Sequence, residues 1–140
     1  MTDMKQAAKS LVLAFGKAWE ARDPDAIVAM LSESVVHQNI PIPPIHGREA
    51  VRRFITPNLR AVQEMRWVFK AIEADDSGRV VLTERVDSFI YENGRVDIPL
   101  MGIFEIADGL ITAWREYADI GQFVRDMQAI GRAPGPGLVQ

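Results

Sequence analysis

The apolar positions of this chain follow a helical spacing in its first half and a strand-like spacing in its second. The helical spacing is clearest near the start, at Ala7, Leu11, Ala14, Phe15, Ala18 and Trp19. Residues three or four positions apart share one face of a helix, which predicts an amphipathic helix over roughly residues 3–21. Asp23-Pro24-Asp25 then offers an N-cap with proline at the first helical position, so a short second helix is expected to run through Leu31.

A short strand and a third helix are expected next. Residues 35–40 have the composition of a strand, which the prolines within 41–44 break. Gly47 opens a helical pattern that continues to about Val62, and Pro57 is expected to kink this helix or end it early.

The second half predicts four strands joined by hairpin turns. The strand-like segments, rich in Val, Ile, Phe, Trp and Thr, are 66–72, 79–91, 95–106 and 110–118. Each break between them contains a glycine, which is typical of hairpins. A last helix is expected over 119–130. Helices followed by a meander indicate an α+β domain, in which a curved sheet of antiparallel or mixed strands wraps around the N-terminal helices and encloses a pocket.

Composition narrows the class of protein. A length of 140 residues with 48% hydrophobic content suits one domain, expected over 1–131, with a flexible Pro/Gly-rich tail at 132–140. The net charge is −3 and the basic residues are scattered, so we expect neither nucleic acid nor a membrane as partner. Two histidines and no cysteine make a poor metal site, and no metal or cofactor is expected. With no apparent leader or spanning segment, we expect a soluble, cytoplasmic protein.

Three polar clusters interrupt the strand-like segments. They are His37-Gln38-Asn39, Arg85-Val86-Asp87 and Trp114-Arg115-Glu116-Tyr117. Because strand side chains alternate, His37 pairs with Asn39 on one face, Arg85 with Asp87, and Trp114 with Glu116. Charged groups that face an interior cost several kcal/mol to desolvate unless they pair, so inward-facing clusters of this kind indicate a catalytic pocket.

Periodicity alone leaves the direction of these side chains open. Over residues 80–90 either alternating face suits the core, and outward-facing Arg85 and Asp87 would be a solvated pair worth less than about 1 kcal/mol. Glu116 has the same ambiguity between core and surface. His37 and Asn39 equally suit a polar pair at a loop edge that bonds backbone. The second histidine, at position 46, lies in a Pro/Gly-rich loop and is expected on the surface.

Four sequence blocks together resemble the limonene epoxide hydrolase family. They are Gln38-Asn39-Ile40-Pro41-Ile42-Pro43-Pro44, Gly47-Arg48-Glu49-Ala50-Val51, Thr83-Glu84-Arg85-Val86-Asp87 and Trp114-Arg115-Glu116-Tyr117. Their order and spacing match as well, and the similarity runs from about residue 8 to 128. The resemblance implies a cone-shaped fold like that of nuclear transport factor 2 (also called SnoaL-like), a cofactor-free homodimer and polar clusters that point inward.

The resemblance also implies roles for five residues. Asp87 would donate a proton to the epoxide oxygen, Glu116 would take a proton from water, and Arg85 would bridge the two carboxylates. Asn39 would hold the water together with a family tyrosine whose position is occupied here by His37. Glu116 is itself a departure, because the family has aspartate there. The imidazole of His37 introduces a group that gains charge between pH 5 and 8 in its unperturbed state.

The expected function is cofactor-independent addition of water to a small apolar epoxide, cyclic or terpenoid-like, in one step to give a vicinal diol. The alternatives are a ketosteroid-isomerase-like or polyketide-cyclase-like enzyme of the same fold, and a non-catalytic protein that binds small ligands. The expected apolar lining of the pocket is Trp67, Phe69, Phe89, Leu100, Ile103 or Phe104, and Trp114.

Overall fold

The computed structural model describes residues 3–133, so most of the expected tail lies outside the described residues. The helices are α1 (Met4–Glu20), α2 (Pro24–Ala29), α3 (Arg48–Ala61) and α4 (Ile120–Ala129). The strands are β1 (Leu31–Ile40), β2 (Ile45–His46), β3 (Glu64–Ala74), β4 (Val80–Tyr91), β5 (Gly94–Ala107) and β6 (Leu110–Ala118). No helix in this range is long and apolar enough to cross a membrane.

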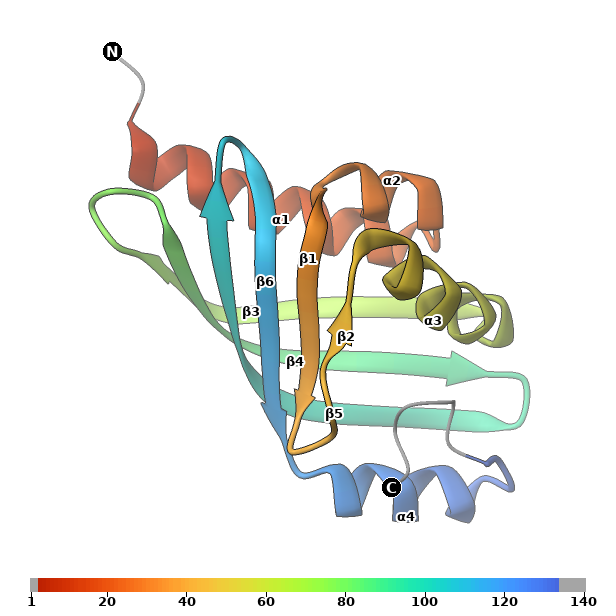
Figure 1. Ribbon diagram of the computed structural model, residues 1–140. Coiled ribbons are helices and arrows are strands. Elements are labelled where there is room, and N and C mark those ends of the chain that lie inside the picture. The colour runs from red at the N-terminus through yellow and green to blue at the C-terminus, as the bar shows by residue number, and fades with distance from the viewer. Residues whose placement is uncertain (1–2, 134–140) are drawn as a thin grey trace.

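The strands form one mixed sheet in the order β2-β1-β6-β5-β4-β3. The meander from β3 to β6 is antiparallel, as predicted, and β1 joins it parallel to β6. Figure 1 shows that the sheet bends sharply, because β1, β2 and β6 run across the direction of β3 and β4. Helices α1, α2 and α3 lie along the upper part of the bent sheet and α4 lies at its lower end, so helices and sheet together surround an interior.

Side-chain caps explain where three of the helices begin. Asp3 accepts hydrogen bonds from the backbone N–H groups of Lys5 and Gln6, and Asp23 accepts one from Ala26. Asp119 caps α4 in the same way. The predicted helix starts were therefore correct to within a residue or two.

Two local predictions were wrong. Leu31 is fully buried at the start of β1 instead of ending α2, because α2 already ends at Ala29. The proline-rich segment contains a two-residue strand, β2, that pairs with Val36 and His37. Helix α3 runs to Ala61, close to the predicted end at Val62, and does not end early at Pro57.

The structure decides which face of β4 points inward. Thr83, Arg85 and Asp87 are each at most 4% exposed, whereas Leu82 on the opposite face is 48% exposed. In β6 the pairing register shifts opposite Glu105, which leaves Thr112 as an extra residue. This bulge is the reason that residues of opposite parity in β6 can both point inward.

An aromatic cluster fills the space between α1 and the sheet. The ring of Phe15 meets those of Trp19, Trp67, Phe104 and Trp114 edge-on, at centroid distances of 5.3 to 6.2 Å. These rings support the inner face of the strands that carry the polar clusters.

Candidate active site

Arg85 on β4 is the centre of a buried charge cluster. Its Nε and Nη2 donate to Asp87 at 3.0 and 2.9 Å, and Nη2 also donates to Glu116 at 2.6 Å. Its Nη1 donates to the Thr83 hydroxyl at 3.1 Å, and the guanidinium carbon lies 3.7 Å from the Trp67 ring centroid. One fully buried guanidinium therefore joins two carboxylates, and its own hydrogen bonds offset the cost of taking the charges out of water.

The absence of a side chain at Gly102 makes room for this guanidinium. Gly102 lies on β5 between Thr83 on β4 and Glu116 on β6. A Cβ at this position would lie 2.7 Å from Arg85 Nη1 and 3.0 Å from the Thr83 hydroxyl. Arg85 can thus reach across β5 to Glu116 only because residue 102 is glycine.

Parallel pairing of β1 with β6 places the polar cluster at 37–39 beside the polar cluster at 114–117. Asn39 is registered with Glu116, and His37 with Trp114. The second carboxylate oxygen of Glu116 accepts a hydrogen bond from the Trp114 indole at 3.0 Å. The His37 ring stacks on the Trp114 ring at a centroid distance of 3.7 Å. His37 is thus a buried strand residue, 3% exposed, and not part of a loop edge.

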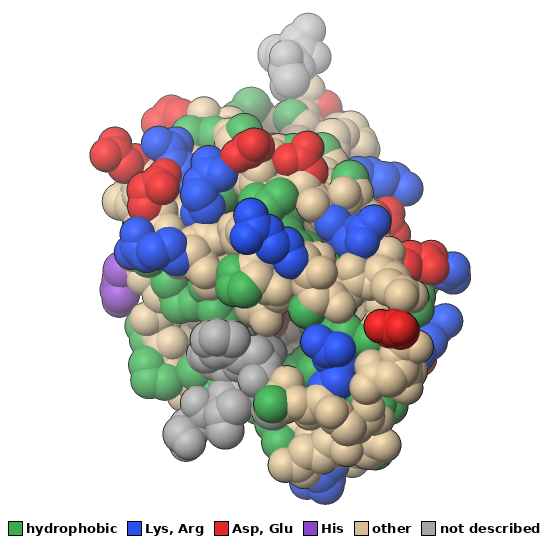
Figure 2. Space-filling view, turned by 90° about the vertical axis from the view of Figure 1, so that its right-hand side faces the viewer, with side chains coloured by type: hydrophobic (Ala, Val, Ile, Leu, Met, Phe, Trp, Pro, Cys, Tyr) green, Lys and Arg blue, Asp and Glu red, His purple; other side chains and the backbone are tan. Residues whose placement is uncertain are grey.

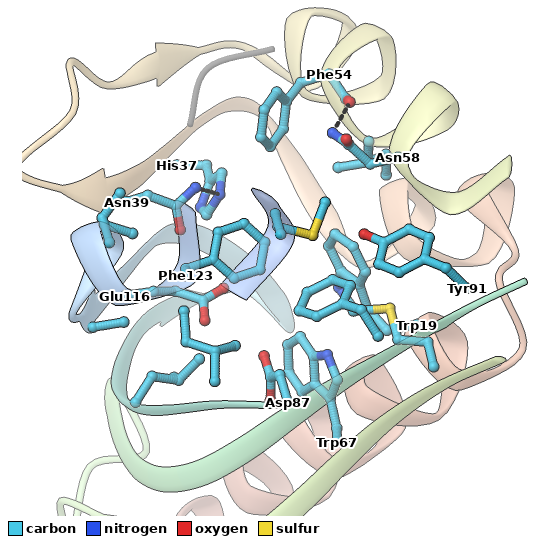
Figure 3. Close-up of a pocket in the computed structure, with 18 residues that line it drawn as sticks. Trp19, His37, Asn39, Phe54, Asn58, Trp67, Asp87, Tyr91, Glu116 and Phe123 are labelled. Atoms are coloured by element: carbon cyan, nitrogen blue, oxygen red, sulfur yellow. Dashed lines mark hydrogen bonds between the residues drawn. The ribbon is translucent and has the colours of Figure 1, made fainter. Parts of the chain in front are cut away.

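The hydrogen bonds of His37 determine which of its ring nitrogens carries the proton. Nδ1 lies 3.3 Å from the Trp114 carbonyl oxygen, which can only accept, so Nδ1 is the donor. In the neutral ring Nε2 is then an acceptor, and it faces the Asn39 amide nitrogen at 3.4 Å. This contact turns the Asn39 amide oxygen away from the ring, toward the cavity side where Glu116 lies (Figure 3).

The environment separates the pKa values of the titratable groups. Burial raises the pKa of Asp87 to about 7, although Arg85 opposes the shift. Burial acts in the same direction on Glu116, but Arg85, His37 and the Trp114 indole together hold the pKa of that carboxyl below its ordinary value. Burial lowers the pKa of His37 to about 4, so this ring does not gain charge between pH 5 and 8 as an unperturbed histidine does. At neutral pH His37 is neutral, Glu116 is ionised and Asp87 lies near half-protonation.

These groups face a cavity between the inner sheet face and the helices. Its polar lining includes His37, Asn39, Asp87 and Glu116, and its remaining walls come mainly from apolar side chains of α1, α3, α4 and the meander strands. Figure 3 shows the polar groups on one side of this space. An ionised and a protonatable carboxyl beside an apolar cavity can accept a proton from one atom of a substrate complex and donate a proton to another.

Within residues 3–133 no three His, Cys, Asp or Glu side chains gather in a way that could hold a metal ion. On the face shown in Figure 2, acidic and basic side chains lie among one another across the upper half.

Comparison with known proteins identifies the family. Residues 6–129 match the model of the limonene-1,2-epoxide hydrolase catalytic domain. The chain belongs to this family. It is 35% identical to epoxide hydrolase EphG of Mycobacterium tuberculosis over 109 residues, which cover 78% of this chain and 71% of the relative. It is thus an enzyme, a hydrolase that acts on epoxides, and the non-catalytic alternative is not supported.

Solved structures agree. A limonene-epoxide-hydrolase-like epoxide hydrolase from M. tuberculosis superposes with a TM-score of 0.77 at 30% identity, covering 89% of this chain and 92% of that one. A protein from Jannaschia sp. CCS1 likened to SnoaL-like polyketide cyclases gives a TM-score of 0.77 at 16% identity, over 96% and 98% of the two chains. The predicted α+β fold, cone-shaped and SnoaL-like, is confirmed.

The structure brings together the five residues to which the resemblance gave roles. Asp87, Arg85 and Glu116 form one hydrogen-bonded cluster, and His37 and Asn39 lie beside it on the neighbouring strand. Of the expected apolar lining, Trp67, Phe89 and Leu100 do line the cavity.

Other residues expected in the lining lie elsewhere. Ile103 points to the outer face of β5, where its neighbour across the strands is Leu82. Phe69 packs against Gly16 of α1, and Phe104 lies under Phe15. Trp114 points inward, but His37 stacks over its ring and separates it from the space.

The sequence did not predict most residues of the cavity wall that faces Asp87 and Glu116. Phe54 and Asn58 contribute from α3, Tyr91 from the end of β4, and Phe123 and Met127 from α4. Phe123 and Met127 lie one turn apart on the predicted last helix, but nothing in that spacing distinguishes a pocket wall from a core contact.

Proposed function

We propose that this enzyme adds water to the epoxide of a small, mainly apolar molecule in one step and releases a vicinal diol. The observation that carries the proposal is the single guanidinium of Arg85 between two carboxyls, Asp87 and Glu116, whose pKa values are shifted in opposite directions beside one cavity. Opening an epoxide in one step requires an acid at the oxygen and an activated nucleophile at a carbon, and this pair supplies both.

In the proposed reaction Glu116 takes a proton from a water molecule while the water oxygen attacks one epoxide carbon. The bond from that carbon to the epoxide oxygen breaks on the opposite side, and the oxygen takes the proton of Asp87. Attack from the rear inverts the carbon, so a cyclic epoxide gives a trans diol. The cycle closes when Glu116 loses its proton and Asp87 regains one. Because no ester to the enzyme forms, the added oxygen comes from water.

Asn39 and His37 position the water in this proposal. The Asn39 amide oxygen faces the side of Glu116, where it can accept a hydrogen bond from the water (Figure 3). Neutral His37 holds that amide through Nε2, and because the lone pair of Nε2 already faces the Asn39 amide nitrogen, the ring does not itself take the proton of the water. His37 is therefore a positioning residue.

The test is hydrolysis of cyclic epoxides, limonene oxide and cyclohexene oxide among them, in water enriched in heavy oxygen. Wild type should give trans diols that carry one solvent oxygen, detected by chiral chromatography with mass detection. Asp87→Asn should remain folded and lose at least 99% of turnover, on the order of the 10²-fold or larger effect of a general acid. Asp97→Asn is the matched control, because Asp97 is an exposed carboxylate on β5 that pairs with Arg95. Full activity of Asp87→Asn, or oxygen transferred from the protein, would reject the mechanism.

We also propose that the enzyme is a homodimer. The outer face of the sheet carries Val68, Leu82, Met101 and Tyr117, each about half exposed on four neighbouring strands. Met101 and Tyr117 are direct neighbours across the strands, and exposed apolar side chains gathered on one sheet face are typical of a protein–protein interface. Sedimentation should give twice the chain mass, and Met101→Lys should lower the mass to that of the monomer. A wild-type monomer at micromolar concentration contradicts the proposal.

The cytoplasmic location stays a prediction from sequence, which cell fractionation would test.

A further inference from the structure

The wall of the cavity opposite the carboxylates contains a second polar group. Tyr91, at the end of β4, lines the cavity and is only 8% exposed, yet no residue within 3–133 hydrogen-bonds to its hydroxyl. Figure 3 shows that the hydroxyl points into the space. Tyr91 and Asp87 lie on the same strand four residues apart, which separates their Cα atoms by roughly 13 Å. In Figure 3 the hydroxyl lies away from Asp87 and Glu116, at another part of the cavity wall.

Asn58 supplies a complementary group. Its amide nitrogen donates to the Phe54 carbonyl one turn earlier in α3, at 2.8 Å. That bond fixes the orientation of the amide, because a carbonyl oxygen can only accept, and leaves the amide oxygen as the available acceptor. Asn58 also lines the cavity, on the same side of Figure 3 as Tyr91.

The Tyr91 hydroxyl is a hydrogen-bond donor at neutral pH. Burial raises its pKa, and the nearby guanidinium of Arg132 only partly opposes that shift. Arg132 also lies over the ring, with its guanidinium carbon 4.3 Å from the ring centroid, and so helps to hold the ring in place.

We propose that Tyr91 and Asn58 form a subsite for an alcohol hydroxyl remote from the epoxide. The substrate hydroxyl accepts a hydrogen bond from Tyr91 and donates one to the Asn58 amide oxygen. The substrate class is then a hydroxylated epoxide with an otherwise apolar skeleton. This inference rests on the proposed function, since it assigns the epoxide to Asp87 and Glu116.

One donor and one acceptor select an alcohol over other groups. A carboxylate would meet the Asn58 oxygen and the negative charge of Glu116 within the same cavity. A purely hydrocarbon substrate would displace water from Tyr91 and leave its hydroxyl unpaired, which costs free energy in a buried site. A site built to bond a hydroxyl rejects the analogue that lacks it more strongly than an apolar pocket rejects one extra methyl group.

The experiment compares two substrates that differ in one group. Both are 1-methylcyclohexene oxides; the first carries a 2-hydroxypropan-2-yl group at ring carbon 4, and the second a tert-butyl group, so that a methyl replaces the hydroxyl. For wild type we expect kcat/KM to favour the alcohol. Tyr91→Phe and Asn58→Ala should each lower kcat/KM for the alcohol roughly tenfold, the effect of one hydrogen bond, and neither should lower the value for the tert-butyl compound, which makes no hydrogen bond there. Asp97→Asn, a change at the exposed carboxylate on β5, is the control and should alter neither.

A binding measurement separates this inference from the proposed function. The corresponding saturated alcohol and its tert-butyl analogue, neither of which has an epoxide, are titrated into wild type and Tyr91→Phe by calorimetry. Tyr91-dependent binding of the alcohol without turnover of either epoxide would reject the hydrolase mechanism and keep the subsite. Turnover of both epoxides with equal losses in Tyr91→Phe, or with none, would overturn the subsite and leave the mechanism standing. Circular dichroism and melting of each variant establish that it is folded.

Discussion

Asp87 is the residue whose protonation decides the rate in the proposed mechanism. Its pKa of about 7 means that the proton-donating form predominates below neutrality and decreases tenfold per pH unit above it. Glu116, whose pKa is lowered, stays ionised over this range. We therefore predict that kcat/KM is nearly constant from pH 5 to 6.5 and decreases about tenfold per unit above pH 7.5. A pH–rate profile checks this, and a rate that rises through pH 8 would exclude Asp87 as the acid.

His37 can be tested apart from its packing. Phenylalanine keeps the ring stacked on Trp114 but removes both hydrogen bonds, so the Asn39 amide loses the acceptor that orients it. We predict that His37→Phe lowers kcat about tenfold, as expected for about 1.4 kcal/mol of lost positioning, with little change in KM. His37→Tyr, which restores the residue implied by the family resemblance, should recover part of the loss. The exposed histidine offers the control His46→Phe, and unchanged kcat in His37→Phe would remove His37 from the mechanism.

For single residues, the sequence predicted which side chains form the polar cluster better than it predicted their burial and pKa values. The blocks around Asn39, Arg85 and Glu116 were sufficient to name the polar cluster by resemblance. The pKa of His37 was not predictable, because it depends on burial under α3 and against Trp114, which residues far apart in sequence create. The alternation of β4 was undecided for a related reason, since both of its faces carry Val, Leu or Phe.

Strand β5 acts as a spacer between the two carboxylates. Because Gly102 has no side chain, this strand leaves the volume that the Arg85 guanidinium occupies. We predict that Gly102→Ala displaces Arg85, destabilises the fold by about 1–3 kcal/mol and abolishes most turnover. Urea unfolding and steady-state rates measure the two effects.

A matched glycine offers the control for that substitution. A Cβ at Gly121, near the start of α4, would lie no closer than 3.3 Å to its neighbours, the nearest being the end of the Arg125 side chain. Gly121→Ala should therefore leave turnover unchanged. If Gly102→Ala kept wild-type turnover, Arg85 would not need its present position.

The elements themselves were largely predictable, with exceptions that have physical causes. The helix caps at Asp23 and the hairpin glycines are local signals, and they gave the right order of helices and strands. Strand β2 was missed because its two residues pair only with β1, a tertiary contact that proline-rich composition conceals. The bulge at Thr112 was missed because both alternating faces of β6 looked equally apolar.

The molecule as a whole combines a buried charge cluster with a fold that must remain stable around it. Asp87 is held in a folded state where its pKa is about 7, against 3.8 as the ordinary value. Between these pH values the folded protein binds a proton that the unfolded chain does not. The stability contributed by this carboxyl is therefore fully present below pH 4 and is lost as pH rises to 7.

We predict a pH-dependent difference in stability between wild type and Asp87→Asn, whose amide does not titrate. The free energy of unfolding of the variant, relative to that of wild type, should rise by at most about 1.4 kcal/mol per pH unit from pH 4 to 7, about 4 kcal/mol in all. Above pH 7 the difference should stay constant. His37 has the opposite dependence, because its lowered pKa destabilises the fold as pH falls below 6.5, but both proteins contain it and its effect cancels in the difference. Urea unfolding of both proteins from pH 4.5 to 8.5 measures this. Parallel stability profiles would mean that Asp87 is already ionised at pH 5, and the acid in the reaction would then have to be another group.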